Sequence, residues 1–235
     1  MKKRLVLGQH FLVSNSIAKS IVDFAAITKK DTVYEVGTGY GILVPYLCQA
    51  AKKVITVEKD RELYLLAVRK FSKYSNLTLK FGDGFKMDEK FSVFISNLPY
   101  SKSKKAIEWV AEKKFLRAIL MVQKEFAEKL LVSSRKKRRA IGVLANYSTK
   151  IERIMDVKRN NFSPKPHVDS VVLRFTKKRQ LSSQVIKTVN LLFSYRNKTT
   201  RNVAKELGFM TDLNGRFEDL TGDEIVKLAK RIVQL

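Results

Sequence analysis

A glycine-rich turn follows the first apolar run that is typical of a buried strand. After residues 32–36 come Gly-Thr-Gly-Tyr-Gly at residues 37–41, and a helical pattern begins at Ile42. An open α/β sheet binds nucleotides at such a turn. Ile42 replaces the last glycine of a dinucleotide fingerprint, and no Gly-Lys-Ser/Thr follows to hold phosphates. The turn therefore predicts a nucleotide-like ligand that is approached by backbone atoms and is not recognised through phosphate.

Carboxylates follow the next two predicted strands. Glu58 ends residues 54–58, a place from which a carboxylate accepts hydrogen bonds from two ribose hydroxyls. Asp83 follows residues 77–81 and is placed to accept a hydrogen bond from an adenine amino group. Either acid alone is most often a solvated loop charge. The glycine turn, Glu58 and Asp83 stand at three consecutive strand ends, however, and together they describe an adenosine pocket. Because phosphate recognition is missing, the pocket points to S-adenosylmethionine as the cofactor.

The sequence Asn97-Leu98-Pro99-Tyr100 follows the fourth predicted strand, residues 93–96. At minimum, an Asn two positions before a Pro is a turn that ends the strand. The four residues also suit attack by an exocyclic adenine nitrogen, whose lone pair is delocalised into the ring. Acceptors on the Asn97 side chain and the Leu98 carbonyl hold both amino hydrogens out of plane, which makes the nitrogen nucleophilic. Pro99 fixes that carbonyl, and the ring of Tyr100, rather than its hydroxyl, offers a stacking surface for a flipped base.

Short β-rich runs alternate with helical patterns, which is typical of an α/β fold with a mostly parallel sheet covered by helices. The predicted strands are residues 32–36, 54–58, 77–81, 93–96, 118–122, 151–157 and 168–175, and the predicted helices are residues 17–26, 42–51, 62–73, 104–113 and 125–131. The last two strands are separated by a proline-bearing loop that is too short for a crossover helix. We therefore expect them to pair antiparallel at one edge of the sheet.

The chain changes character after residue 175. Residues 176–180, Thr-Lys-Lys-Arg-Gln, are polar and charged, and everything that follows has helical periodicity. Residues 221–224, Thr-Gly-Asp-Glu, form a capping-box signature before an amphipathic final helix. We expect a catalytic domain at residues 1–176 and a small all-helical domain at residues 181–235 that docks to RNA.

The composition restricts the partners. The 235 residues carry 47 Lys and Arg against 22 Asp and Glu, a formal net charge of +25, yet 45% are hydrophobic. This is a globular chain whose field attracts polyanions, among which nucleic acid ranks first. One Cys and two His exclude a disulfide framework and a structural zinc site, so we expect no metal. Apolar stretches are too short for a membrane span or a signal peptide, which predicts a cytoplasmic protein that does not act on membranes.

A basic run, Arg-Lys-Lys-Arg-Arg at residues 135–139, stands in a predicted loop. Such a run is usually a solvated face. Together with Lys102, Lys104 and Lys105 after Tyr100, it suggests a positive rim that neutralises RNA phosphates without reading sequence.

Six motifs, in chain order, resemble the small-subunit ribosomal RNA adenine dimethyltransferase family. They are Leu-Gly-Gln-His-Phe-Leu at residues 7–12, Glu-x-Gly-x-Gly-x-Gly at 35–41, Asn-Leu-Pro-Tyr at 97–100, Met-Val-Gln-Lys-Glu at 121–125, Phe-Ser-Pro-Lys-Pro-His-Val-Asp-Ser at 162–170 and Phe-x-x-Arg-x-Lys-x-x-x-Asn at 193–202. The resemblance covers nearly the whole predicted catalytic domain and extends into the tail. Departures at residues 140–145, Asn197 and Thr200 touch RNA docking and tail packing rather than chemistry.

The resemblance implies a class I, Rossmann-like methyltransferase fold with a seven-stranded sheet whose last strand is antiparallel. It implies transfer of methyl groups from S-adenosylmethionine to N6 of two adjacent adenosines near the 3′ end of small-subunit rRNA, during ribosome biogenesis. The implied partner is that rRNA within a pre-ribosomal particle, bound by a monomer.

The resemblance also assigns residues to roles. The implied cofactor contacts are Gln9, His10, Leu12, Glu35, Gly37, Gly39, Gly41, Glu58, Lys59, Asp83, Gly84, Phe85 and Asn97. The implied catalytic, base-holding residues are Asn97, Leu98, Pro99 and Tyr100, with Phe162 as a second stacking face, although an aromatic residue before a proline-rich loop is core packing about as often. The expected RNA contacts are Lys102, Lys104, Lys105, Arg135, Lys136, Lys137, Arg138, Arg139, Arg196 and Lys198.

Three alternatives remain at this point. A resistance methyltransferase of large-subunit rRNA more often has Ile in place of Leu98 and a different tail. A non-catalytic ribosome-assembly or RNA-binding factor on the same fold has no need of both an intact glycine turn and an intact Asn97 motif. A DNA adenine methyltransferase usually has Asp at the position of Asn97 and lacks residues 162–170 of this chain.

Overall fold

The computed structural model describes residues 10–97, 99–132, 134, 135, 137–211 and 215–234. The predicted site residues Gln9, Leu98 and Lys136 lie outside these ranges. The chain divides into two compact units. The first contains the residues up to 106 together with 114–127 and 152–176, and the second contains 107–113, 128–151 and the residues from 177 onward. The predicted helical region 181–235 thus belongs to the second unit, together with two internal segments of the chain.

A seven-stranded sheet organises the first unit. Its order is β4 (Leu77–Phe81), β3 (Lys53–Glu58), β2 (Thr32–Val36), β5 (Val93–Ser96), β6 (Arg117–Gln123), β9 (Ser170–Lys177) and β7 (Thr149–Val157). The strands from β4 to β6 pair in parallel, and β9 pairs antiparallel with β6. The α/β class and the antiparallel final strand are confirmed. Strand β9 lies between β6 and β7, so β7 forms the edge of the sheet.

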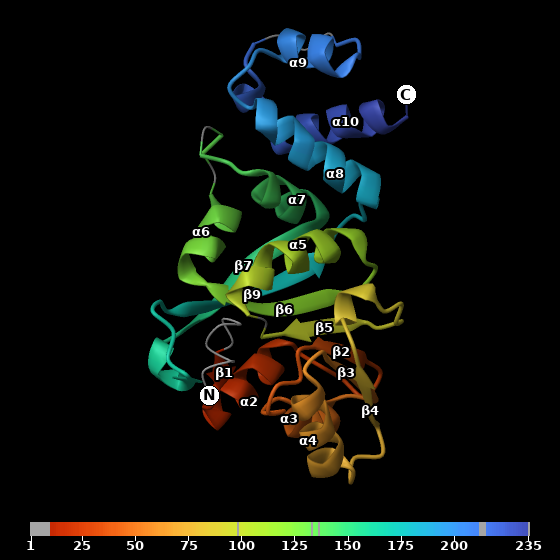
Figure 1. The fold of residues 1–235 in the computed structure, drawn as a ribbon, viewed down its shortest axis with the longest axis vertical. Coiled ribbons are helices and arrows are strands. Elements are labelled where there is room, and N and C mark those ends of the chain that lie inside the picture. Colours follow the sequence, from red (N-terminus) through yellow and green to blue (C-terminus); the bar gives the residue numbers. More distant parts are fainter. Residues whose placement is uncertain (1–9, 98, 133, 136, 212–214, 235) are drawn as a thin grey trace. The chain divides into compact units, whose positions relative to one another are not determined.

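The inner strands β2, β3, β5 and β6 are buried along nearly their whole length, as expected for a parallel sheet that helices cover on both faces. Helices α2 (Asn15–Phe24), α3 (Val44–Ala50) and α4 (Arg61–Phe71) belong to this unit, and α3 and α4 contact β3 (Figure 1). Ser14 caps α2 and Asp60 caps α4 by accepting hydrogen bonds from backbone N–H groups of the first turn. These helices begin and end within a few residues of their predicted bounds.

A second, very short pairing was not predicted. Strand β1 (Phe11–Leu12) pairs antiparallel with β8 (Phe162–Ser163), and the Val13 N–H donates to the Asn161 carbonyl at 2.8 Å. Two-residue strands have no periodicity to detect, and the partners are far apart in the sequence. This pairing nevertheless brings the two most distant motifs of the first unit together.

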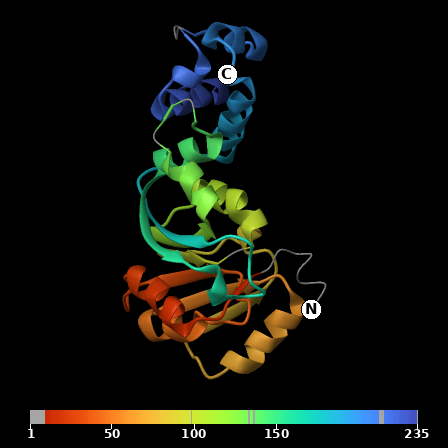
Figure 2. The same cartoon turned by 90° about the vertical axis from the view of Figure 1, so that its left-hand side faces the viewer.

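The second unit is helical and has its own apolar core. It contains the ends of α5 (Ser103–Glu112) and α6 (Lys124–Leu131), followed by α7 (Ala140–Ser148), α8 (Ser183–Leu192), α9 (Thr200–Leu207) and α10 (Gly222–Val233). Helix α10 packs against α7 and α8 (Figure 2). The predicted capping box at Thr221 and Glu224 is present. Helix α7 was not predicted, because six of its nine residues are buried and such a run carries no amphipathic period.

Candidate active site

A cavity of about 440 Å³ opens at the carboxyl ends of β2, β3, β4 and β5 in the first unit. This is the edge at which open α/β sheets bind ligands. The predicted residues that line it are His10, Leu12, Glu35, Gly37, Gly39, Glu58, Lys59, Asp83, Gly84, Phe85, Asn97, Pro99, Lys102 and Lys105. The sequence motifs that were separated by up to 95 positions therefore meet around one cavity.

The glycine turn holds its shape through positive φ angles at Gly37 (87°), Gly39 (55°) and Gly41 (71°), a region that favours glycine. A Cβ at Gly39 would lie 3.1 Å from the ring of Phe11, so the N-terminal segment approaches the turn closely. Gly41 differs from the other two. A Cβ there would lie 2.1 Å from the Phe71 ring, and Gly41 faces an outer groove rather than the cavity.

Glu35 reaches the turn through a relay of hydroxyl groups. The Thr56 hydroxyl donates to Glu35 Oε2 at 2.6 Å and lies 2.6 Å from the hydroxyl of Thr38, a residue of the turn. Burial raises the pKa of Glu35 to about 8, the Thr56 hydrogen bond lowers it, and the charge of Glu58 raises it further. Glu35 is therefore mostly protonated at neutral pH. It supports the glycine turn through the hydroxyl groups of Thr56 and Thr38.

Glu58 is held by backbone donors on both oxygens. The Gly39 N–H donates to Oε2 at 2.8 Å, and the N–H groups of Lys59 and Asp60 donate to Oε1 at 2.8 and 2.9 Å. Only 6% of the residue is exposed. Each carboxylate oxygen has two acceptor positions, so Oε2 retains capacity for a ligand hydroxyl.

Asp83 is shared between a backbone donor and a lysine. Its Oδ1 accepts from the Phe85 N–H at 3.0 Å and its Oδ2 accepts from Lys105 Nζ at 2.9 Å. Burial raises the pKa of Asp83, but the hydrogen bonds from Lys105 and Phe85 outweigh it and hold the pKa below its ordinary value. Lys105 Nζ also lies 5.0 Å from the centre of the Phe85 ring. Lys105, expected to contact RNA phosphate, thus stands at the rim of the cavity.

The Asn97 segment leaves the end of β5. The Ser96 hydroxyl donates to the Val36 carbonyl at 2.6 Å, which ties this strand end to β2, and Asn97 and Pro99 line the cavity. Pro99 then begins a short 3₁₀ helix, Tyr100–Lys102. The Tyr100 ring lies 5.4 Å from the ring of His10, centre to centre. Its hydroxyl is 2.9 Å from the hydroxyl of Ser170.

Comparison with known proteins shows which proteins this chain is similar to. The family model described as ribosomal RNA adenine dimethylase matches residues 1–230. The chain belongs to the ribosomal RNA adenine dimethylase family. It is 35% identical over 233 residues to the ribosomal RNA small subunit methyltransferase A of Thermotoga maritima, covering 96% of this chain and 84% of that protein. It is 34% identical over 210 residues to the probable ribosomal RNA small subunit methyltransferase A of Methanococcus maripaludis, covering 86% and 80%.

Solved structures show the fold of the family. A dimethyladenosine transferase from Plasmodium falciparum has a TM-score of 0.79 at 24% identity and covers 96% of this chain and 98% of that chain. The 23S rRNA methyltransferase ErmE has a TM-score of 0.67 at 21% identity and covers 95% and 100%. The Rossmann-like methyltransferase fold with a helical C-terminal region is therefore common to these proteins and the present chain.

Phe162 differs from its predicted role in this member of the adenine dimethylase family. Only 4% of the residue is exposed, and its ring lies in the apolar core of the first unit, with its backbone paired to Leu12. In this structure the ring offers almost no exposed surface to a base. The structure gives Phe162 a packing role.

The basic residues of the second unit are largely engaged within that unit. Arg135 Nη1 donates to the Asp219 carbonyl at 3.0 Å, and Arg138 Nη1 donates to the Leu220 carbonyl at 2.8 Å. Lys198 pairs with Glu206, and Arg196 Nε donates to Asn197 at 3.4 Å. Lys137 and Arg139 are exposed, as is Lys104 in the first unit. The basic run therefore ties down the chain before α10 as well as carrying charge.

Several residues that line the cavity have no role in the prediction from sequence. Thr38, Tyr40, Asp60 and Ser101 line the cavity and adjoin predicted residues, so their position in the motifs is a sufficient signal. Ser170 was quoted within a family motif but given no role, because its contact with Tyr100 spans 70 positions.

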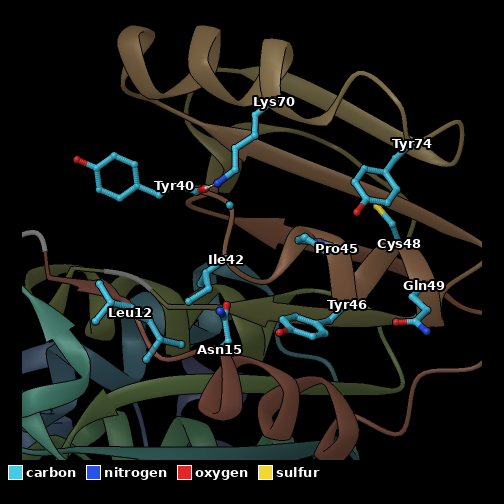
Figure 3. Close-up of a pocket in the computed structure, with 12 residues that line it drawn as sticks. Leu12, Asn15, Tyr40, Ile42, Pro45, Tyr46, Cys48, Gln49, Lys70 and Tyr74 are labelled. Atoms are coloured by element: carbon cyan, nitrogen blue, oxygen red, sulfur yellow. Dashed lines mark hydrogen bonds between the residues drawn. The ribbon is translucent and has the colours of Figure 1, made fainter.

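A second hollow, the outer groove, has a volume of about 820 Å³ and lies beside α3 (Figure 3). Tyr40, Tyr46 and Tyr74 line it, and Lys70 Nζ donates to the Tyr40 carbonyl at 3.0 Å. Burial raises the pKa of its Cys48 thiol to about 11, so the thiolate is scarce. Within the described ranges, no cluster of three His, Cys, Asp or Glu can hold a metal ion, and no helix has the length and apolarity to cross a bilayer.

Proposed function

We propose that the protein dimethylates N6 of two adjacent adenosines near the 3′ end of small-subunit rRNA, with S-adenosylmethionine as methyl donor. The relatives named ribosomal RNA small subunit methyltransferase A support the choice of subunit. The observation that carries the proposal is the single cavity in which Asn97 and Pro99 stand with Glu58 and Asp83. A cofactor bound by Glu58 and Asp83 and a base bound by Asn97 would therefore lie next to each other in this cavity.

The residues of the cavity fit the proposed cofactor. Glu58 offers an acceptor for ribose hydroxyls, Asp83 offers one for the adenine amino group, and the glycine turn lets backbone atoms approach closely. When bound, S-adenosylmethionine supplies an electrophilic methyl group on its sulfonium. Glu35 keeps the glycine turn in place through Thr56.

The remaining residues act on the target base. The Asn97 side-chain oxygen accepts one amino hydrogen, and the sequence assigns the second acceptor to the Leu98 carbonyl, with Pro99 fixing the local backbone. Tyr100 stacks on the flipped base. For each methyl transferred, the amino nitrogen would form a bond to the methyl carbon, the carbon–sulfur bond of the donor would break and leave its electron pair on sulfur as a neutral thioether, and the nitrogen would release one proton to solvent.

The partner and the setting complete the proposal. The formal charge of +25 suits a particle rich in RNA. We propose that the protein acts as a cytoplasmic monomer on a pre-ribosomal small subunit, without a metal. Its C-terminal domain, residues 181–235, docks to the rRNA, and exposed Lys102 and Lys104 contribute phosphate contacts beside the cavity.

Mass spectrometry of rRNA fragments tests the proposal. Under-methylated small subunits are incubated with the protein and labelled S-adenosylmethionine, with large subunits and an Asn97→Ala variant as controls. Dimethyladenosine at two adjacent positions near the 3′ end, present only with small subunits and wild-type protein, is expected. Label confined to the large subunit supports the resistance type, and absence of label with intact cofactor binding supports a non-catalytic factor.

A further inference from the structure

The hydroxyl group of Tyr100 has a defined partner at the end of a distant strand. Tyr100 Oη lies 2.9 Å from Ser170 Oγ, and both residues belong to the first unit. Ser170 is fully buried, whereas Tyr100 is partly exposed. A buried hydroxyl that meets a partly exposed phenol is placed to hold that phenol, because the buried partner has little freedom of its own.

Ser170 is fixed on both of its sides. It is the first residue of β9 and stands opposite Gln123 in the antiparallel pairing with β6. The Lys124 N–H donates to the Asp169 carbonyl at 3.1 Å. The Asp169 carboxylate in turn accepts from the Arg159 N–H at 2.9 Å. The strand pairing and the bonds of the preceding loop thus fix the backbone at Ser170.

Tyr100 by itself has a weaker support. It begins a three-residue 3₁₀ helix, and Pro99 before it has no backbone N–H to bond. The backbone of so short a turn does not by itself fix the orientation of the Tyr100 ring. The bond to Ser170 adds a second attachment at the far end of the ring. Because a phenolic hydrogen prefers the plane of the ring, this bond also restrains the tilt of the stacking surface.

The neighbouring ring is held by the same loop. The Pro164 carbonyl accepts a hydrogen bond from His10 Nδ1 at 2.8 Å, which requires that Nδ1 carries the hydrogen. The His10 and Tyr100 rings are inclined by 31° to each other. The segment from Pro164 to Ser170 therefore holds both aromatic side chains, His10 through the Pro164 carbonyl and Tyr100 through the Ser170 hydroxyl.

We propose that Ser170 is a positioning residue for the target adenine, acting through the hydroxyl of Tyr100. This inference rests on the proposed function. The Ser170 hydroxyl fixes the plane on which the base stacks, and that plane determines whether the amino group reaches the Asn97 acceptor. The structure thus changes the expectation from sequence that only the ring of Tyr100 matters, because Tyr100→Phe removes the same bond as Ser170→Ala.

A double-mutant cycle tests the proposal. Initial rates of methyl transfer to under-methylated small subunits are measured for wild type, Ser170→Ala, Tyr100→Phe and the double variant, at saturating and at limiting substrate. Each single variant is expected to lower the rate constant at saturating substrate by about threefold to tenfold, the range for loss of one hydrogen bond. The double variant is expected to resemble either single one, because both remove one bond.

Three controls separate positioning from stability. Ser148→Ala removes another fully buried serine hydroxyl, in the second unit, and is expected to keep the wild-type rate. Calorimetry is expected to give unchanged S-adenosylmethionine affinity in every variant. A 2-aminopurine probe at the target position reports stacking, and its fluorescence in the complex is expected to rise in Ser170→Ala and Tyr100→Phe alike. Tyr100→Phe keeps the test intact if Ser170→Ala folds poorly, since it changes the more exposed partner.

The outcomes distinguish the inference from the proposed function. Wild-type rates and wild-type fluorescence in both single variants would overturn the role of Ser170. Rate losses that multiply in the double variant would also overturn it, since they would show independent effects. If wild-type protein itself fails to methylate adenine, the proposed function fails instead.

Discussion

Charged side chains bond to the backbone in opposite senses in the cavity of the first unit and in the basic run of the second unit. In the first unit, the carboxylates of Glu58 and Asp83 accept hydrogen bonds from backbone N–H groups at strand ends. In the second unit, Arg135 and Arg138 donate to the carbonyls of Asp219 and Leu220. The acids shape a cavity and still have acceptor capacity, whereas these arginines hold the chain together. Arg135 and Arg138 therefore keep their charge but have fewer N–H donors left for RNA phosphates.

The largest effect is expected at Asn97. If its side-chain oxygen holds an amino hydrogen in the transition state, Asn97→Ala lowers the rate of methyl transfer by about 10² to 10³. A monomethylated nitrogen has only one hydrogen left for two acceptors, so the ratio of monomethyl to dimethyl adenosine is also expected to change. Mass spectrometry at saturating cofactor measures both quantities. Unchanged turnover with an unchanged ratio would reduce the motif to a structural turn.

A smaller effect is expected at Glu58. Loss of hydrogen bonds to a charged group weakens S-adenosylmethionine binding by about 1.5 to 3 kcal/mol in Glu58→Ala. Because Glu58 also accepts three backbone hydrogen bonds, Glu58→Gln is the matched control that keeps the size and one acceptor oxygen. Calorimetry gives the affinities. The same affinity in Glu58→Ala and wild type would remove Glu58 from the binding site.

The buried acid of the first unit predicts a pH dependence of stability. The pKa of Glu35 is about 8 in the folded protein against an ordinary value of 4.5. The folded state thus holds a proton that the unfolded state has lost, so stability is complete below pH 4.5 and declines as pH rises towards 8. The expected slope is at most about 1.4 kcal/mol per pH unit. Chemical unfolding at pH 6 and 7 measures it, and Glu35→Gln is expected to flatten it. Equal slopes in both proteins contradict an elevated Glu35 pKa.

The smallest effects are expected in the basic run. There, Arg138 is expected to affect stability, and its neighbour Lys137 is expected to affect RNA binding. Arg138→Ala removes the bond to Leu220 and is expected to lower the unfolding free energy by about 1 kcal/mol. Lys137→Ala is expected to leave stability unchanged and to reduce the salt dependence of RNA binding by about 0.7 to 0.9 for one phosphate contact. Denaturant unfolding and binding at several salt concentrations measure the two. A stability loss in Lys137→Ala with none in Arg138→Ala would contradict the structural role of Arg138 and the RNA-binding role of Lys137.

Sequence proved informative where partners are close along the chain. Glu58 accepts from residues one and two positions later, and Asp83 from a residue two positions later, so strand ends and turns reveal them. Parallel strands gather their carboxyl ends at one edge, which predicts that the motifs at those ends lie together. The capping box of Thr221 and Glu224 follows from an equally local rule.

The contacts that escaped prediction are long-range. Arg135 and Arg138 bond to residues 84 and 82 positions away, and Tyr100 meets Ser170 across 70 positions. No local pattern specifies such a contact. Phe162 shows the complementary difficulty, because an aromatic side chain in a motif looks alike whether it faces a ligand or the core, and only burial decides between them.

The pairing of β1 with β8 has a consequence for the order in which the protein is made. His10 meets Pro164 across 154 positions, and Phe11 and Leu12 have no strand to pair with until Phe162 and Ser163 have been synthesised. The glycine turn and Glu58 are complete much earlier in translation. The chain segment that covers them must therefore wait, and the capacity to bind cofactor is expected to appear only when most of the chain has left the ribosome.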